Sequence, residues 1–240
     1  MKLTVMKFGG SSVADANKIK LVARRIIAKK NEGGRVIAVV SAQGDTTDDL
    51  LEAAAQITAN PPPREMDVLL STGEMISISL LSMAIDSMGE KVLSLTGPQA
   101  GILTDENHQK AKIVKIDVKK MKSALNKYPI LIVAGFQGQN PKGDIATLGR
   151  GGSDLTAVAI AAAMKADSCE IYSDVEGVFT TDPRAVKEAK KLDFLSYDEM
   201  LELAGSGAQV LQSRSVEVAK KFNVIIKAGS SFSENQGTII

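Results

Sequence analysis

The chain has 240 residues and a formal net charge of +1, and 44% of its residues are hydrophobic, 24% charged and 4% aromatic. A charge so close to zero creates no overall field for a nucleic acid or a membrane surface, so we expect neither partner. The apolar fraction suffices for a sizeable aliphatic core in one large α/β domain or two small ones. The single Cys169 excludes an internal disulfide, and the single His108 has no second His or Cys nearby that would suggest zinc.

The first 30 residues predict a strand, a tight loop and a helix. A short apolar run at residues 3–6 favours a strand, and a helical pattern then continues to about Lys30. Ser12 and Asp15 stand where they could cap that helix. Five apolar residues at helical spacing share one of its faces: Ile19, Val22, Ala23, Ile26 and Ile27.

The loop between this strand and helix could hold a phosphate. Gly9 and Gly10 allow a sharp turn and a close approach to a ligand, and the helix behind them directs free N–H groups at the loop. Lys7 could add an ammonium against the charge of a transferring phosphoryl group. The loop matches neither the dinucleotide-binding nor the Walker A pattern, so a plain turn beside a surface lysine stays open.

The remaining pattern alternates strands and helices, which predicts one α/β domain over residues 1–240, a three-layer α/β/α sandwich around a mostly parallel sheet. Pro61-Pro62-Pro63 must end a helix, and Ser71-Thr72-Gly73-Glu74 either opens or interrupts the next one. The pattern between residues 100 and 117 is ambiguous, and residues 140–144 suggest a hairpin tip. Strands are expected at 35–40, 91–95, 130–134, 169–173 and 224–227, and helices at 48–59, up to 88, 118–127, 155–165, 196–204 and 208–221.

A second glycine-rich loop, Gly149 to Asp154, precedes the small-residue helix at 155–165. Its Arg150 offers a fork of donors for a carboxylate or a phosphate. Ser41 and the polar residues after it follow the strand at 35–40, and open α/β sheets bind ligands at such carboxyl ends. The sequence therefore places several anion-binding groups at the same edge of the predicted sheet.

Three stretches together resemble the aspartate kinases of the amino acid kinase superfamily. The resemblance runs from the first strand to the terminal Ile240 and includes residues 135–138 and 214–217. The three stretches are Lys7-Phe8-Gly9-Gly10-Ser11-Ser12, Gly149-Arg150-Gly151-Gly152-Ser153-Asp154, and Tyr172-Ser173-Asp174-Val175-Glu176-Gly177-Val178-Phe179-Thr180-Thr181-Asp182-Pro183-Arg184.

The resemblance implies transfer of the γ-phosphoryl group of MgATP to the side-chain carboxylate of L-aspartate, on the route to lysine, threonine and methionine. It also implies a homodimer formed through the catalytic domain. A carboxylate with a pKa near 4 is ionised at neutral pH, so the nucleophile needs no general base. The rivals are kinases of the same fold for glutamate, acetylglutamate, carbamate or a nucleoside monophosphate, and a binding module without turnover.

The resemblance also assigns roles to residues. Lys7 would stabilise the transferring group with Asp154 orienting it, while Arg150, Glu74 and Thr47 would bind the α-carboxylate, the α-ammonium and a carboxylate oxygen of aspartate. The ligands of Mg²⁺ stay unassigned, and we expect most of them to be phosphate oxygens and water. The expected nucleotide site comprises Lys7, Phe8, Gly9, Gly10, Ser11, Ser41, Ser173, Asp174, Phe179, Thr180, Thr181, Asp182, Pro183, Arg184 and Gln209. The expected aspartate site comprises Asp45, Thr46, Thr47, Glu74, Arg150, Gly151, Gly152, Ser153 and Asp154.

Two features depart from the family pattern. Relatives often carry lysine where Gln209 stands, so ATP affinity is expected to be the property that differs. Aspartate kinases usually continue into a pair of regulatory ACT domains after the point that corresponds to Ile240, so we expect no feedback inhibition of this chain by lysine or threonine. Met1-Lys2 leads straight into a short strand, and the sequence shows no long apolar run, so we expect a soluble, cytoplasmic protein.

Overall fold

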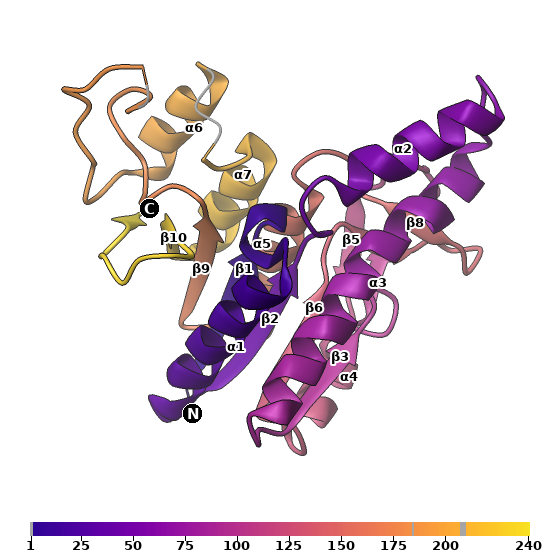
Figure 1. Ribbon diagram of the computed structural model, residues 1–240, viewed down its shortest axis with the longest axis horizontal. Helices are drawn as coiled ribbons and strands as arrows, with labels where there is room; N and C mark the ends of the chain where they lie inside the picture. The colour runs from indigo at the N-terminus through magenta and orange to yellow at the C-terminus, as the bar shows by residue number, and fades with distance from the viewer. Residues whose placement is uncertain (1, 184, 207–209) are drawn as a thin grey trace.

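The computed structural model describes residues 2–183, 185–206 and 210–240. Its described residues form a seven-stranded sheet in the order β11-β10-β9-β1-β2-β6-β3, in which only β11 runs antiparallel to its neighbour (Figure 1). The strands are β1 Leu3–Phe8, β2 Arg35–Val40, β3 Val92–Leu95, β6 Ile130–Ala134, β9 Ser168–Ser173, β10 Ile226–Ser230 and β11 Thr238–Ile239.

Continuous apolar runs form the centre of this sheet because both of its faces are covered. In β6, Ile130, Ile132 and Ala134 belong to one buried cluster, whereas Leu131 and Val133 belong to the other. Helices α1 Ala16–Asn31 and α3 Pro63–Ser87 pack on the first face, and α4 Val118–Leu125, α5 Gly152–Met164, α6 Tyr197–Gly205 and α7 Ser213–Phe222 contribute to the second cluster (Figure 1). The three-layer α/β/α expectation is confirmed.

A smaller sheet lies beside the main one, in the order β5-β4-β7-β8. Its strands are β4 Ile102–Thr104, β5 Ile113–Ile116, β7 Gln137–Gln139 and β8 Ile145–Thr147. The ambiguous pattern between residues 100 and 117 thus corresponds to β4 and β5. The expected hairpin tip joins β7 to β8, where the side chain of Asn140 accepts hydrogen bonds from the N–H groups of Lys142 and Asp144.

Helix α3 differs from both readings of its sequence, because it begins at Pro63 and continues unbroken through Ser71-Thr72-Gly73-Glu74. Proline suits the first helical turn, where its missing N–H costs nothing. The hydroxyls of Ser71 and Thr72 donate to carbonyls of their own helix, those of Val68 and Leu69. By length and composition alone α3 is apolar enough to cross a membrane, but it packs against the sheet as a core helix, with side chains such as Leu81 fully buried.

Smaller differences concern helix starts. Asp15 caps α1 by accepting from the N–H groups of residues 17 and 18, whereas Ser12 bonds instead to the hydroxyl of Ser231 at 2.5 Å. Helix α2 spans Thr46–Ile57, two residues earlier at each end than expected. Helix α7 begins at Ser213, not at residue 208, and its predicted first residues partly lie outside the described ones.

Candidate active site

A cleft of about 360 Å³ opens at the carboxyl ends of β1 and β2. This is where open α/β sheets bind ligands, because the loops after neighbouring parallel strands meet there. In this structure the loop after β1, the loop after β2, the middle of α3 and the start of α5 all reach the cleft. It is lined by Lys7, Gly10, Ser41, Ala42, Gly44, Thr47, Glu74, Phe136, Arg150, Gly151, Gly152, Ser153, Asp154 and Gln212.

Lys7 and Asp154 form an ion pair in this cleft. The ammonium of Lys7 lies 2.8 Å from Oδ1 of Asp154, and both side chains are nearly buried, at 11% and 10% exposure. Lys7 stands near the end of β1, and Asp154 lies in the first turn of α5, whose start at Gly151 adopts a left-handed conformation with φ 72°. The contact that the sequence assigned to these two residues is therefore present.

The glycine loop after β1 is held tightly between its neighbours. The N–H of Gly9 donates to the carbonyl of Tyr172, so the loop is fastened to the end of β9. A Cβ atom on Gly10 would lie 2.6 Å from the carbonyl oxygen of Ala42. Only glycine fits this position without a shift of the backbone, and the loop thereby stays close to the ammonium of Lys7.

Glu74 supplies a buried carboxylate to the wall of the cleft. Oε1 accepts the N–H of Ala42 at 3.0 Å, whereas Oε2 has no hydrogen-bond partner among the described residues. Burial raises the pKa of Glu74 to about 7. Gly73 lets α3 approach closely, because a Cβ atom there would lie 2.7 Å from the Cβ of Ala42. A desolvated carboxylate with one oxygen left without a hydrogen bond favours a cationic ligand group.

Arg150 presents a guanidinium with no hydrogen bond or ion pair to any residue that the structure describes. Its side chain lines the cleft and is otherwise exposed. Its main chain, in contrast, is fixed, because Arg214 of α7 donates to the carbonyls of Leu148 and Arg150 at 3.0 and 2.6 Å. The loop is therefore anchored while the guanidinium remains available for an anion, which it can bind with two parallel hydrogen bonds.

Some expected site residues lie elsewhere. Phe8 is fully buried and stacks on Tyr172 with ring centroids 5.2 Å apart, so its side chain packs in the core and does not line the cleft. Thr47 and Ser41 line the cleft as expected, whereas Asp45 and Thr46 do not. Asp45 instead precedes α2, where its carbonyl accepts the N–H groups of residues 48 and 49. Ser11 is exposed beside the cleft without lining it.

The segment expected to bind the nucleotide follows β9 and lies outside the cleft. Ser173 and Asp174 come directly after the point where β9 pairs with the end of β1. Phe179 pairs with Lys191 in an isolated antiparallel bridge, and residues 180–183 are exposed. Arg184 and Gln209 lie outside the described residues, so the structure does not place these two. The described residues of the segment follow the strand next to that of Lys7 but do not line the cleft.

Sequence reasoning missed Ala42, Gly44, Phe136 and Gln212 as lining residues of the cleft. Phe136 follows β6 in the left-handed region, with φ 67°, a conformation that no pattern of residue types indicates for phenylalanine. Gln212 packs on Gly151 so closely that a Cβ there would lie 2.1 Å from its Cγ. The glycine at 151 was the available signal, because glycine marks sites of close approach, but it does not say what approaches.

Such a cleft, with a lysine near the end of a strand paired to an aspartate in the first turn of a helix and with an anion-binding glycine loop, is suited to phosphoryl transfer. The model of the amino acid kinase family matches residues 2–228, and the chain belongs to that family. Among curated proteins the chain is 54% identical over 242 residues to the aspartokinase of Mycolicibacterium smegmatis and 55% identical over 241 residues to that of Corynebacterium glutamicum. Both matches cover 100% of this chain and 57% of the relative, so the chain spans little more than half the length of these relatives.

Solved structures give the same picture. Aspartate kinase from Synechocystis superposes with a TM-score of 0.91 at 46% identity, over 99% of this chain and 39% of that one. Aspartokinase III of E. coli, solved in complex with aspartate and ADP, superposes with a TM-score of 0.88 at 26% identity, over 99% and 64%. Uridylate kinase from Archaeoglobus fulgidus, at 20% identity and a TM-score of 0.70, shares the fold.

Proposed function

We propose that this chain transfers the γ-phosphoryl group of ATP to the side-chain carboxylate of L-aspartate, giving 4-phospho-L-aspartate and ADP. One observation carries the proposal: one cleft combines two charged groups beside the Lys7–Asp154 pair. They are the buried carboxylate of Glu74, whose Oε2 has no hydrogen-bond partner among the described residues, and the guanidinium of Arg150, which forms no ion pair within the described part of the chain. These two groups match the α-ammonium and α-carboxylate of a free amino acid. The identity to aspartokinases supports aspartate as that amino acid.

The chemistry asks little of the protein beyond alignment and charge compensation. Glu74 receives the α-ammonium and Arg150 the α-carboxylate, which leaves the side-chain carboxylate of aspartate directed toward Lys7. That carboxylate is already ionised at neutral pH, so no residue has to remove a proton. The ammonium of Lys7 reduces the repulsion between the attacking carboxylate and the transferring phosphoryl group, and Asp154 keeps it in place.

The nucleotide side of the proposal rests on proximity. Gly9, Gly10 and Ser11 turn around the end of β1. The neighbouring β9 ends at Ser173, and Asp174 and residues 179–183 follow it. The E. coli relative was solved in complex with aspartate and ADP, which supports ATP as the phosphoryl donor. Mg²⁺ is proposed as the cofactor that accompanies ATP. The described residues contain no group of three or more His, Cys, Asp or Glu that could hold a metal, which fits an ion bound mainly by phosphate oxygens and water.

We also propose that the chain acts as a cytoplasmic homodimer on the biosynthetic route to lysine, threonine and methionine. A single catalytic domain, 1–240, binds aspartate mainly through its N-terminal part and the nucleotide mainly through its C-terminal part. The exposed side of α3 supports self-association, because it carries the uncharged stripe Val68, Met75, Ile76, Leu80 and Met83. Met83→Glu is expected to shift the molar mass measured by light scattering from two chains toward one.

The proposed activity is tested by trapping the acyl phosphate with hydroxylamine, with aspartate and glutamate assayed in parallel and ADP release followed separately. We expect hydroxamate with aspartate only. Lys7→Ala is expected to lower kcat by about a thousandfold, because the transferring charge loses its main counter-charge. Lys20→Ala, an exposed lysine on α1, is the matched control and is expected to behave as the unaltered chain. Hydroxamate with glutamate alone would reassign the substrate, and ligand binding without ADP release would leave only a binding module.

A further inference from the structure

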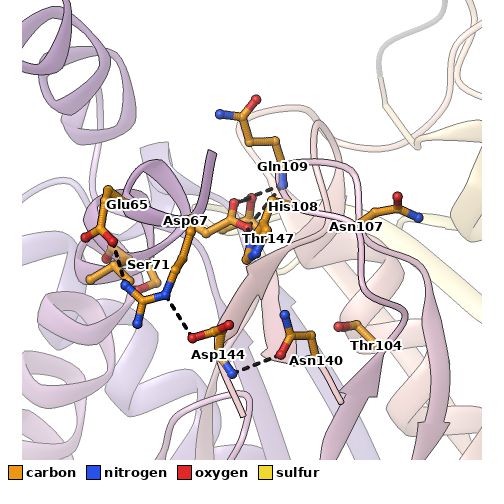
Figure 2. A network of polar contacts seen from close by, with 12 residues as sticks. Glu65, Asp67, Ser71, Thr104, Asn107, His108, Gln109, Asn140, Asp144 and Thr147 are labelled. Carbon is orange, nitrogen blue, oxygen red and sulfur yellow. Dashed lines mark hydrogen bonds and ion pairs between the residues drawn. The ribbon is translucent and has the colours of Figure 1, made fainter. Parts of the chain in front are cut away.

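A second buried carboxylate on α3 has no part in the proposed chemistry. Asp67 is fully buried and accepts hydrogen bonds from three directions. The N–H of Gln109 approaches its oxygens at 3.0 and 3.1 Å, the hydroxyl of Thr147 at 2.5 Å, and Nδ1 of His108 at 2.6 Å. Figure 2 shows these contacts converging on Asp67 from the segment before β5 and from the end of β8.

The partners of Asp67 belong to the support of the Arg150 loop. Thr147 ends β8, three residues before Arg150. Gln109, in a left-handed conformation with φ 63°, places its carbonyl oxygen 2.9 Å from where a Cβ of Gly149 would lie. The N–H of Ala111 donates to the carbonyl of Thr147 at 2.9 Å, which joins the two segments again. Asp67 thus fastens the near side of the loop, as Arg214 fastens its carbonyls from α7.

Asp67 and Glu74 are seven residues apart on one continuous helix. Seven residues make almost two turns, so the two carboxylates share a face of α3 and stand about 10 Å apart along its axis. One of them meets the cleft directly and the other holds the strand that leads to Arg150. The spacing between the two proposed receptors for the amino acid is therefore set by a single rigid element.

We propose that Asp67 is a positioning residue that fixes Arg150 relative to Glu74 and thereby determines how strictly the site requires an α-carboxylate on its substrate. The inference rests on the proposed function, because Arg150 and Glu74 receive the amino acid there. The exposed ion pair of Arg64 with Asp144, at 2.9 Å, joins α3 to the β7–β8 hairpin nearby, but exposed pairs of this kind contribute little (Figure 2).

The first test removes one contact while preserving shape. Thr147→Val deletes the hydroxyl that donates to Asp67, and Asp67→Asn is the second variant, should either one fail to fold. We expect KM for aspartate to rise about tenfold, in line with the loss of a buried hydrogen bond to a charged group, while KM for ATP changes less than about twofold. Thr4→Val, a buried threonine at the opposite end of β1, is the matched control and is expected to change neither constant.

The second test asks whether the effect passes through Arg150. In an Arg150→Ala background, Thr147→Val is expected to leave KM for aspartate unchanged, because the guanidinium through which Thr147 and Asp67 act on aspartate is absent. The preference for aspartate over β-alanine, which lacks only the α-carboxylate, is expected to narrow about tenfold in Thr147→Val alone. Equal rises of KM for aspartate and for ATP would show that Asp67 has a merely structural role and would overturn the proposal. Effects of Thr147→Val and Arg150→Ala on KM for aspartate that are fully additive would overturn it as well.

A third readout does not depend on activity. Trypsin cleavage after the exposed Arg150, followed by mass spectrometry on the ligand-free protein, is expected to be several times faster in Thr147→Val and Asp67→Asn than in Thr4→Val. If the unaltered chain fails to phosphorylate aspartate but this acceleration is seen, the proposed function fails and the support of the loop by Asp67 stands. If the chain is active and neither the cleavage rate nor KM for aspartate changes, the inference about Asp67 fails alone.

Discussion

The two sides of the proposed site are built differently. The amino acid side uses buried or anchored groups on regular elements: Glu74 inside α3, Asp154 in the first turn of α5, and Arg150 on a loop held by Arg214. The nucleotide side beyond the glycine loop is a run of exposed residues after β9, attached by main-chain bridges such as that between Phe179 and Lys191. In the proposed function, recognition of the amino acid therefore depends on charges held by regular elements, whereas the nucleotide is bound mainly by exposed residues.

We expect the largest difference between the two sides when Arg150 on the amino acid side is substituted. Arg150→Ala should raise KM for aspartate about a hundredfold, because it removes a bidentate, charge-assisted contact, and should leave KM for ATP nearly unchanged. Arg150→Lys should recover part of the loss, since lysine keeps the charge but not the fork. Steady-state kinetics with each substrate varied in turn provides the measurement. A parallel rise of both KM values would mean that the two sides are not separable.

An intermediate effect is expected from the pKa of Glu74, about 7 when aspartate is absent. An ammonium ligand pairs with the ionised carboxylate, so below pH 7 KM for aspartate should rise up to tenfold per pH unit. Glu74→Gln should bind aspartate more weakly and show a flat profile between pH 5.5 and 8.5. If KM for aspartate of the unaltered chain is equally independent of pH, Glu74 does not bind the α-ammonium.

The raised pKa of Glu74 also predicts how the stability of the folded chain depends on pH. Between the ordinary glutamate value and about 7 the folded chain keeps a proton that the unfolded chain releases, so stability falls as pH rises through this window. Ionised Glu74 then costs about 3 kcal/mol at pH 8. In denaturant unfolding, the free energy of unfolding of Glu74→Gln should therefore increase relative to that of the unaltered chain from pH 5 to pH 8.

The smallest effect is expected on the exposed nucleotide segment. Thr180→Val removes the side-chain acceptor for the N–H of Lys190, a contact of 3.1 Å at an exposed position. The free energy of unfolding should fall by less than about 1 kcal/mol, because water replaces an exposed hydrogen bond at little cost. A loss comparable to that of a buried contact, measured by chemical denaturation, would contradict the contrast between the two sides.

Much of this arrangement could be predicted from local pattern. The apolar runs at 35–40 and 130–134 match β2 and β6 residue for residue, because strands covered on both faces need continuous apolar sequence. The glycine pairs at 9–10 and 151–152 marked the two loops that line the cleft. The family resemblance implied that Asp154 orients Lys7, and the structure places the two charged groups 2.8 Å apart.

The rest depended on contacts between distant segments. Asp67 reads as one polar residue in a helical stretch, and nothing local shows that its partners come from 41 and 80 residues further along the chain. The start of α3 was missed because Ser71-Thr72-Gly73 resembles a helix boundary, yet tertiary packing carries the helix through it. Phe136 was missed because its left-handed backbone is imposed by its surroundings.

The close approach of Gly73 to Ala42 bears on attempts to broaden substrate range. Beside Glu74 the cleft is lined by the small residue Ala42, behind which Gly73 packs closely, so little side chain there can be removed to make room. A longer amino acid would be admitted more readily by shortening Gln212, which lines the same cleft with a larger side chain. Mutagenesis libraries would therefore gain more from position 212 than from positions 42 and 73.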